Sequence, residues 1–442
     1  MASTVRVNVP RDNFCERAYA VSTLFEEILG VNVYVEAGDV QNYEILIDGA
    51  KRVLVRDHFF GRFPEVRSYL TRDALPTEIA ICDAPWVPEP GLPVLFGSGE
   101  YSSKDGVLTC DADLFASAFF LLTRWEEFVL PDRDEHGRVP SRCQCAVIHG
   151  FHHRPIVNEY AEALRAMLDL VGCSLASRTR EFRLVMTHDV DRVYSGSRGR
   201  GFLSERPFAV SKRTLIDGYY KAARIDPLRS FQRIMQESEQ RSLQARFYFI
   251  AGGHTDKEGY YDLDDPGIRL LLEEIDTRGH VVGFHPSYDA VSDPSMWRAE
   301  KLRLEELTQR PCVEGRQHYL RWENPSTWRL WNENGMRMDS TMGFSDTLGY
   351  RCGTGDAFPV FDILASETLA LREQPLIAMD SAMRYMSRDT RRHALARLVD
   401  VSKRYRMPLT VLFHNHSLDP TIWSWAEESY AALFDNAYAG VT

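Results

Sequence analysis

Between residues 182 and 413 the chain alternates short apolar, β-rich runs with longer helical patterns. This alternation limits the possible folds more than any other feature. The predicted strands are residues 182–186, 246–251, 280–284 and 408–413, and the predicted helices are 266–278, 296–310 and 326–334. Alternation of this kind is typical of βα units, and in a barrel of such units the active site lies where the strands end.

The first of these runs ends in five residues that carry chemistry, Thr187-His188-Asp189-Val190-Asp191. Strand side chains alternate between faces, so Thr187, Asp189 and Asp191 are expected on one face and His188 and Val190 on the other. Two neighbouring carboxylates at a strand end cannot both be bare and buried. They require a cation, a shared proton or water.

The residues before this point predict a separate α/β domain. Strands are expected at residues 5–9, 31–36, 43–48, 78–82 and 92–96, and helices at 16–29, 111–128 and 157–171. No glycine-rich phosphate-binding motif occurs there. A polar stretch at 174–180 suggests a boundary, so we predict an N-terminal α/β domain over residues 1–178 and a catalytic domain over 179–442.

Composition excludes several classes of protein. The chain has 442 residues, with 52 Lys and Arg against 63 Asp and Glu, and its net charge is −11. That charge opposes binding to nucleic acid or to an anionic membrane. No apolar run is long enough to cross a bilayer, and the N-terminus lacks a secretory pattern. The 8 scattered cysteines suit reduced thiols. We therefore expect a soluble, cytoplasmic protein.

One segment departs from this acidic balance. Residues 192–229 contain nine Lys or Arg against three acids, a local charge of +6 (9 − 3). One interpretation is a solvated helical hairpin. The other is a basic helical insert, at about residues 192–240, that covers a site for an anionic ligand such as a phosphate-bearing sugar.

Acidic and histidine side chains gather at or after the predicted strand ends. They are Asp189, Asp191, His285, Asp289, His318, His414 and His416. Each alone is more often structural than catalytic. Together, imidazole and carboxylate groups suit one divalent metal ion, with zinc the first candidate, and a coordination position left open for water. A carboxylate could then take the proton of that water, and a histidine on the opposite wall could protonate the leaving group.

Six segments in order carry a family resemblance. They are THDVD (187–191), RFYFIAG (246–252), GHVVGFHPSYD (279–289), RQHYLRW (316–322), MDSTMGFSD (338–346) and LFHNH (412–416). They resemble the motifs of the polysaccharide deacetylase family, carbohydrate esterase family four, over roughly residues 180–430. The resemblance implies a distorted (β/α) barrel of about seven strands and metal-dependent removal of an acyl group, usually N-acetyl, from a sugar. The whole chain also resembles members found with surface-polysaccharide (O-antigen or capsule) biosynthesis, which carry an extra N-terminal α/β domain.

The resemblance implies a role for each matching residue. Asp189 matches the catalytic base and Asp191 the metal-binding aspartate, in an Asp-x-Asp form. His285 matches the first metal histidine. Arg316 matches the arginine that orients the base. Asp339 falls in the motif that supports the site, and His414 matches the general acid.

Three departures leave details open. Asp289 stands where the family usually has its second metal histidine, and it could still be a ligand if Pro286 opens a helical turn. Alternatively His318, which replaces a usual proline, supplies the missing imidazole, and we favour it slightly. The distance in sequence from Asp191 to His285 is 94 residues (285 − 191), lengthened mainly by the basic insert. Such an insert favours a smaller, charged substrate over a long polymer.

Candidate substrate-binding residues are Tyr319, Arg321, Trp322 and Arg351, which could stack on a sugar or contact an anion. Core packing and surface ion pairs are their alternatives. We expect a deacetylase of an amino sugar or nucleotide sugar. A cyclic amide or imide hydrolase and an inactive glycan-binding protein are the other interpretations.

Overall fold

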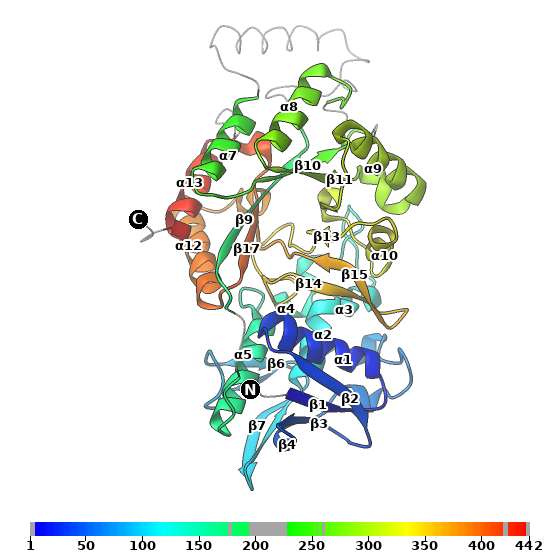
Figure 1. Ribbon diagram of the computed structural model, residues 1–442, viewed down its shortest axis with the longest axis vertical. Helices are drawn as coiled ribbons and strands as arrows, with labels where there is room; N and C mark the ends of the chain where they lie inside the picture. The colour runs from blue at the N-terminus through cyan, green and yellow to red at the C-terminus, as the bar shows by residue number, and fades with distance from the viewer. Residues whose placement is uncertain are drawn as a thin grey trace. The chain divides into compact units, whose positions relative to one another are not determined.

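The computed structural model describes residues 5–175, 179–193, 228–253, 255–258, 261–418 and 423–438. The chain forms two compact units (Figure 1). Unit 1 comprises Met1–Glu181, Glu323–Asn332 and Gly349–Pro375, and unit 2 comprises Phe182–Trp322, Glu333–Leu348 and Leu376–Thr442. Most of the predicted basic insert lies outside the described residues.

Unit 2 contains a parallel sheet, in the order β13-β12-β11-β10-β9-β17-β16. Its strands are β9 (Arg183–Val190), β10 (Arg246–Ile250), β11 (Val281–His285), β12 (Glu314–Gly315), β13 (Met338–Asp339), β16 (Ala378–Met379) and β17 (Pro408–Leu412). The register sets Tyr248 of β10 opposite Asp189 of β9, and Ile250 opposite His285 of β11. The carboxyl ends of neighbouring strands are thereby brought level.

Helices follow the strands of unit 2. They are α7 (Arg229–Glu239), α8 (Pro266–Thr277), α9 (Pro294–Thr308), α11 (Asp380–Met383), α12 (Arg388–Arg404) and α13 (Ser424–Tyr438). Aspartates cap the first turns of α8 and α9, each of which begins with proline. Helices α12 and α13 pack together, and α12 contacts β17 (Figure 1). The predicted strand–helix alternation is confirmed here, because apolar strands that are buried on both faces need helical cover.

The sheet of unit 2 is not seen to close. Over the residues that the structure describes, no pairing joins β13 to β16, so the predicted barrel is not confirmed. What is observed is a mixed α/β protein with several sheets. No helix in the described ranges has the length and apolar composition needed to cross a bilayer.

Unit 1 is built on a mixed sheet in the order β2-β1-β3-β4-β8-β7. Its strands are β1 (Val5–Pro10), β2 (Val33–Gly38), β3 (Tyr43–Ile47), β4 (Ala50–Val55), β7 (Gly97–Lys104) and β8 (Val107–Ala112). Two antiparallel pairs accompany it, β5 (Ala80–Cys82) with β6 (Leu92–Val94) and β14 (Phe358–Asp362) with β15 (Glu367–Glu373). The predicted N-terminal α/β character is confirmed.

Seven helical segments of four residues or more occur in the described parts of unit 1. They are α1 (Phe14–Ser22), the π-helix η1 (Thr23–Ile28), α2 (Leu114–Thr123), α3 (Trp125–Val129), α4 (Cys145–Ile148), α5 (Ile156–Leu170) and α10 (Ser326–Glu333), of which α10 ends one residue beyond the unit. Rings of Phe59, Tyr69 and Trp125 pack in the core at centroid distances of 5.7–6.0 Å.

The single helix predicted over residues 111–128 is wrong. It starts later, because Asp113 caps α2, and it breaks at Arg124, whose φ is 52°. The amide of Asn324 donates to the carbonyl oxygens of Thr123 and Arg124 at 2.9 and 3.1 Å. The buried Arg124 guanidinium donates to Glu127 at 2.9 Å. The side chain of Asn324 thus satisfies backbone carbonyls that the break exposes.

Candidate active site and metal centre

The predicted site residues of unit 2 come from neighbouring strand ends. Asp189 lies in β9 and Asp191 follows it, while His285 is the last residue of β11. Arg316 and His318 follow β12, and His414 follows β17. Because these strands are parallel and adjacent in the sheet, their carboxyl ends meet at one edge.

Asp191, His285 and His318 converge on one point. One ligand atom from each lies within 4.8 Å of the other two. Asp191 Oδ1 is 3.7 Å from His285 Nε2 and 3.6 Å from His318 Nε2. Ligand atoms around a tetrahedral zinc ion, with bonds of about 2.0–2.1 Å, lie about 3.3 Å apart. The donor set and its spacing therefore fit a divalent metal ion.

His285 is oriented by the backbone carbonyl of Arg316, the residue that follows β12. Its Nδ1 lies 2.6 Å from the carbonyl oxygen of Arg316, to which it donates a proton. In the neutral ring Nε2 then carries the lone pair, and this atom faces both aspartates, at 3.7 Å from Asp191 and 3.8 Å from Asp189. A histidine ligand whose second nitrogen is fixed in this way is typical of metal sites.

Arg316 binds the predicted base. Its side chain is fully buried and donates to Asp189 Oδ1 at 2.7 Å. It also donates to the hydroxyls of Thr187 and Ser340 at 3.0 and 2.9 Å, and its guanidinium lies 5.2 Å from the ring of Tyr248. The predicted facing of Thr187 and Asp189 is thus confirmed, since both meet Arg316. His188 packs on the other side, with its ring 5.3 Å from Phe247.

His414 approaches the other carboxylate oxygen of Asp191. Its Nε2 is 3.7 Å from Asp191 Oδ2, and its Nδ1 is 2.7 Å from Asp380 Oδ1. Asp380 is fully buried, and it also accepts from the backbone amide of His414 at 2.8 Å and from the hydroxyl of Ser417 at 2.5 Å. Asp380 therefore fixes both the ring and the backbone of His414.

Proton affinities in the site are strongly shifted. Burial alone would raise the pKa of Asp191, but its contact with His285 and the charges of His414 and His318 lower that pKa far below the usual range. Burial lowers the pKa of His414, whereas the carboxylate of Asp380 outweighs it and raises this pKa to about 10. Concentrated negative charge of this kind favours a cation.

Glu258 also reaches the site, from the loop after β10. Its side chain is buried, and Oε1 lies 3.4 Å from Nδ1 of His318. His318 begins a short turn, η7 (His318–Leu320), in which Tyr319 and Leu320 both have positive φ, 58° and 55°. Left-handed backbone at two successive non-glycine residues is costly and is typical of functional sites.

The other predicted residues are placed as follows. Asp289 is exposed in η6 (Tyr288–Ser292) and is not among the three converging groups. Asp339 is buried and accepts a hydrogen bond from the hydroxyl of Thr341 at 2.5 Å. That hydroxyl in turn accepts from the backbone amide of Gln317 at 3.0 Å. Asp339 thus supports the segment between Arg316 and His318.

The predicted substrate-binding residues have mixed environments. Tyr319 is 37% exposed and lies 5.3 Å from the ring of Tyr288, over which Arg321 stacks at 4.0 Å. Trp322 is buried. Arg351 lies in unit 1 and is buried, with two donor contacts to Glu127 at 3.0 and 2.5 Å.

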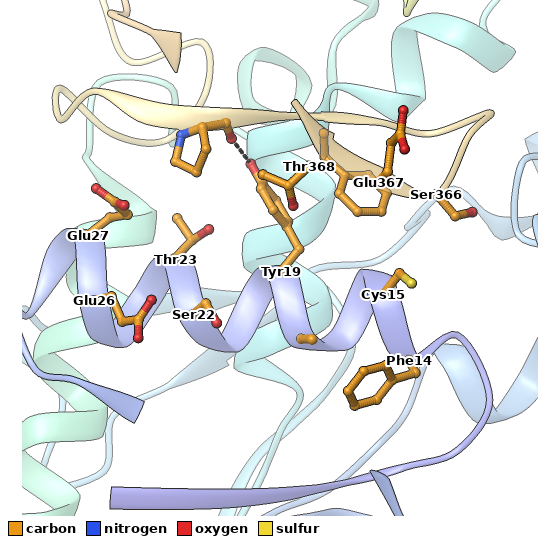
Figure 2. Close-up of a pocket in the computed structure, with 13 residues that line it drawn as sticks. Phe14, Cys15, Tyr19, Ser22, Thr23, Glu26, Glu27, Ser366, Glu367 and Thr368 are labelled. Carbon is orange, nitrogen blue, oxygen red and sulfur yellow. Dashed lines mark hydrogen bonds between the residues drawn. The ribbon is translucent and has the colours of Figure 1, made fainter. Parts of the chain in front are cut away.

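Hollows among the described residues are found in each unit. In unit 2 a cavity of about 410 Å³ has Glu258, Ser287, Asp289 and Glu300 in its walls. In unit 1 a groove of about 470 Å³ runs between helices α1 and η1 and the β14–β15 pair. Figure 2 shows Tyr19 crossing this groove, and its hydroxyl donates to the carbonyl oxygen of Pro359 at 2.8 Å. In the described ranges, no metal-ligand cluster lines the groove.

Part of the chain matches a known family model. Residues 5–171 match the model of a family of unknown function, DUF7033. No curated protein matches the chain. A solved structure from Mycobacterium smegmatis, assigned to the polysaccharide deacetylases, is similar at 14% identity and a TM-score of 0.37, covering 59% of this chain and 86% of that one.

A second solved structure, from Bordetella bronchiseptica, is assigned as a polysaccharide deacetylase involved in O-antigen biosynthesis. It is 13% identical with a TM-score of 0.31, covering 60% of this chain and 86% of that one. A polysaccharide deacetylase from Bacillus cereus is 11% identical with a TM-score of 0.29. The match covers 58% of this chain and 87% of that one.

Sequence reasoning missed two residues of this site, Asp380 and Glu258. Asp380 follows the apolar residues Leu376–Met379, and a strand end of that kind could have indicated it. Glu258 lies in a loop after Gly252 and Gly253, where no periodic pattern marks it. Only the folded chain brings it to His318.

Proposed function

We propose that the protein is a metal-dependent hydrolase that removes an acyl group, N-acetyl in the first instance, from an amino sugar or nucleotide sugar. The observation that carries the proposal is the convergence of Asp191, His285 and His318 beside an aspartate paired with a buried arginine. The ordered motifs that resemble the polysaccharide deacetylases support the same reaction class. Surface-polysaccharide biosynthesis is the process in which we expect it to act.

Each side chain has a distinct part in the proposed reaction. Asp191, His285 and His318 would hold the ion, which supplies Lewis-acid polarisation of the acyl carbonyl when bound. Asp189 accepts the proton of the attacking water through Oδ2, because Oδ1 is engaged by Arg316. His414, with Nδ1 fixed by Asp380, presents Nε2 to the leaving nitrogen and protonates it.

Metal content tests this function most directly. Purified protein is expected to contain about one equivalent of a divalent ion, because the ligand set forms a single site. The Asp191→Ala variant is expected to contain little or none, since one ligand is lost. Elemental analysis after dialysis against zinc measures both. A wild-type protein that binds no divalent ion under any condition would overturn the proposal.

The bond that is cleaved can be tested separately. Acetate release from a panel of N-acetylated amino sugars and nucleotide sugars is the expected activity. Ring opening of cyclic imides without acetate release would favour the related C–N hydrolase. Metal binding without either reaction would favour the glycan-binding interpretation.

The identity of the third ligand gives a second prediction. His318→Ala is expected to weaken metal affinity by more than the roughly 10–100-fold that loss of a supporting residue costs. Asp289→Ala is expected to leave affinity unchanged, because Asp289 is exposed and outside the converging group. Competition with a chromophoric chelator measures both variants. Equal and negligible losses would remove both residues from the site.

A further inference from the structure

The carboxylate of Glu258 has three polar neighbours and almost no contact with solvent. The hydroxyl of Thr255 donates to Oε2 at 2.6 Å, and the backbone amide of Tyr288 donates to Oε1. Nδ1 of His318 lies 3.4 Å from Oε1. Burial of a carboxylate is costly unless such donors compensate it. Of these three neighbours, only the imidazole of His318 belongs to the proposed metal site.

The local backbone is shaped to this carboxylate. Gly253 has a φ of +82°, and a Cβ atom there would lie 2.9 Å from the Glu258 side chain and 2.8 Å from Cβ of Ser287. Any larger residue would have to displace one of them. The main chain at Gly253 therefore lies close against the Glu258 side chain, which a residue with a Cβ atom would have to displace.

The geometry selects one tautomer of His318. A carboxylate beside Nδ1 favours a proton on that nitrogen, which leaves the lone pair on Nε2. Nε2 is the atom that lies 3.6 Å from Asp191. We propose that Glu258 is a positioning residue, which fixes the tautomer and direction of His318 and strengthens it as a metal ligand. This inference rests on the proposed metal site.

The imidazoles of His285 and His318 are held in different ways. His285 is oriented by a backbone carbonyl, whereas His318 lies on a turn with unfavourable backbone angles and has no carbonyl contact of that kind on Nδ1 among the described hydrogen bonds. Nδ1 of His318 makes no hydrogen bond within the described residues, and the carboxylate of Glu258, 3.4 Å away, is the charged group that faces it. A histidine supported by a carboxylate is also a more basic ligand than one supported by a carbonyl.

A double-mutant cycle tests this role without an activity assay. Glu258→Gln keeps the shape of the side chain and removes its charge. It is expected to weaken Zn²⁺ affinity by about 10–100-fold, measured by chelator competition, and to alter the visible spectrum of bound Co²⁺. In a His318→Ala background the same change is expected to cost nothing further, because the ligand that it supports is gone.

Two further variants complete the test. Glu300→Gln is the matched control, a buried carboxylate that accepts from the amide and hydroxyl of Ser287 at 2.8 and 2.5 Å, and it is expected to change affinity little. Thr255→Val loosens Glu258 with less risk to folding. It is expected to give a smaller loss of affinity, again only when His318 is present.

The outcomes separate the inference from the proposed function. Unchanged metal affinity in Glu258→Gln and Thr255→Val, with metal bound normally by the wild type, overturns the inference alone. A loss that persists in the His318→Ala background also overturns it, because Glu258 would then act as a ligand or through packing. A wild-type protein without metal affinity overturns both.

Discussion

Asp189→Asn is expected to lower kcat for acyl release by about 10²–10⁴-fold, the usual contribution of a general base. An amide has the shape of the carboxylate and can still accept from Arg316, but it cannot take a proton from water. Metal content is expected to stay unchanged, because Asp191, His285 and His318 remain. Acetate release at saturating substrate measures the effect.

Asp276→Asn is a suitable control for this variant, because its carboxylate pairs with Arg310 on the exposed face of α8. Both variants should fold and carry metal equally well. Undiminished turnover by Asp189→Asn would mean that another group accepts the proton. The proposed division of labour between Asp189 and Asp191 would then be wrong.

The largest effect on stability is expected from Arg316→Ala. The fully buried guanidinium donates to Asp189, Thr187 and Ser340, and its loss leaves an almost fully buried carboxylate without a cation. Breaking a buried ion pair in this way costs about 3–5 kcal/mol. Arg316→Lys should lower the free energy of unfolding less than Arg316→Ala does. A lysine keeps the positive charge beside Asp189 and loses only the planar arrangement of guanidinium N–H donors.

Native-state hydrogen exchange at the amides of β9 and β17 is the appropriate measurement for this variant. A chain with two compact units need not unfold in one step, so the free energy should be read from unit 2 itself. Arg298→Ala, an exposed arginine on α9, is expected to stay within about 0.5 kcal/mol of wild type. A comparable loss in both variants would contradict the central role of Arg316.

The sequence predicts the four longer strands of unit 2, β9, β10, β11 and β17, because each is an apolar run bounded by turn residues or a helical pattern. The two-residue strands β12, β13 and β16 carry no such pattern. For that reason Arg316 and Asp339 were found through motifs and Asp380 was missed. The hydrophobic pattern of a segment indicates which of its own residues are buried. A two-residue strand is too short to show such a pattern, and it forms because the neighbouring strands pair with it.

The break at Arg124 was unpredictable for a different reason. Residues 111–128 form a continuous helical pattern, and the groups that favour the break come from Asn324, 200 residues later (324 − 124). The same holds for Glu258 and His318. A local sequence pattern can indicate which residues are candidates for a site. It does not predict which of them will be in contact, because those contacts join segments that are far apart in the sequence.

The spacing of the three proposed ligands also bears on when the protein can take up an ion. Asp191 and His285 are 94 residues apart, and Asp191 and His318 are 127 apart (318 − 191). An unfolded chain would lose much entropy in bringing such distant groups together, so it offers no competing site of similar strength. Metal uptake would therefore follow the pairing of β9, β11 and β12 during folding. The bound ion would stabilise the folded sheet and not the unfolded chain.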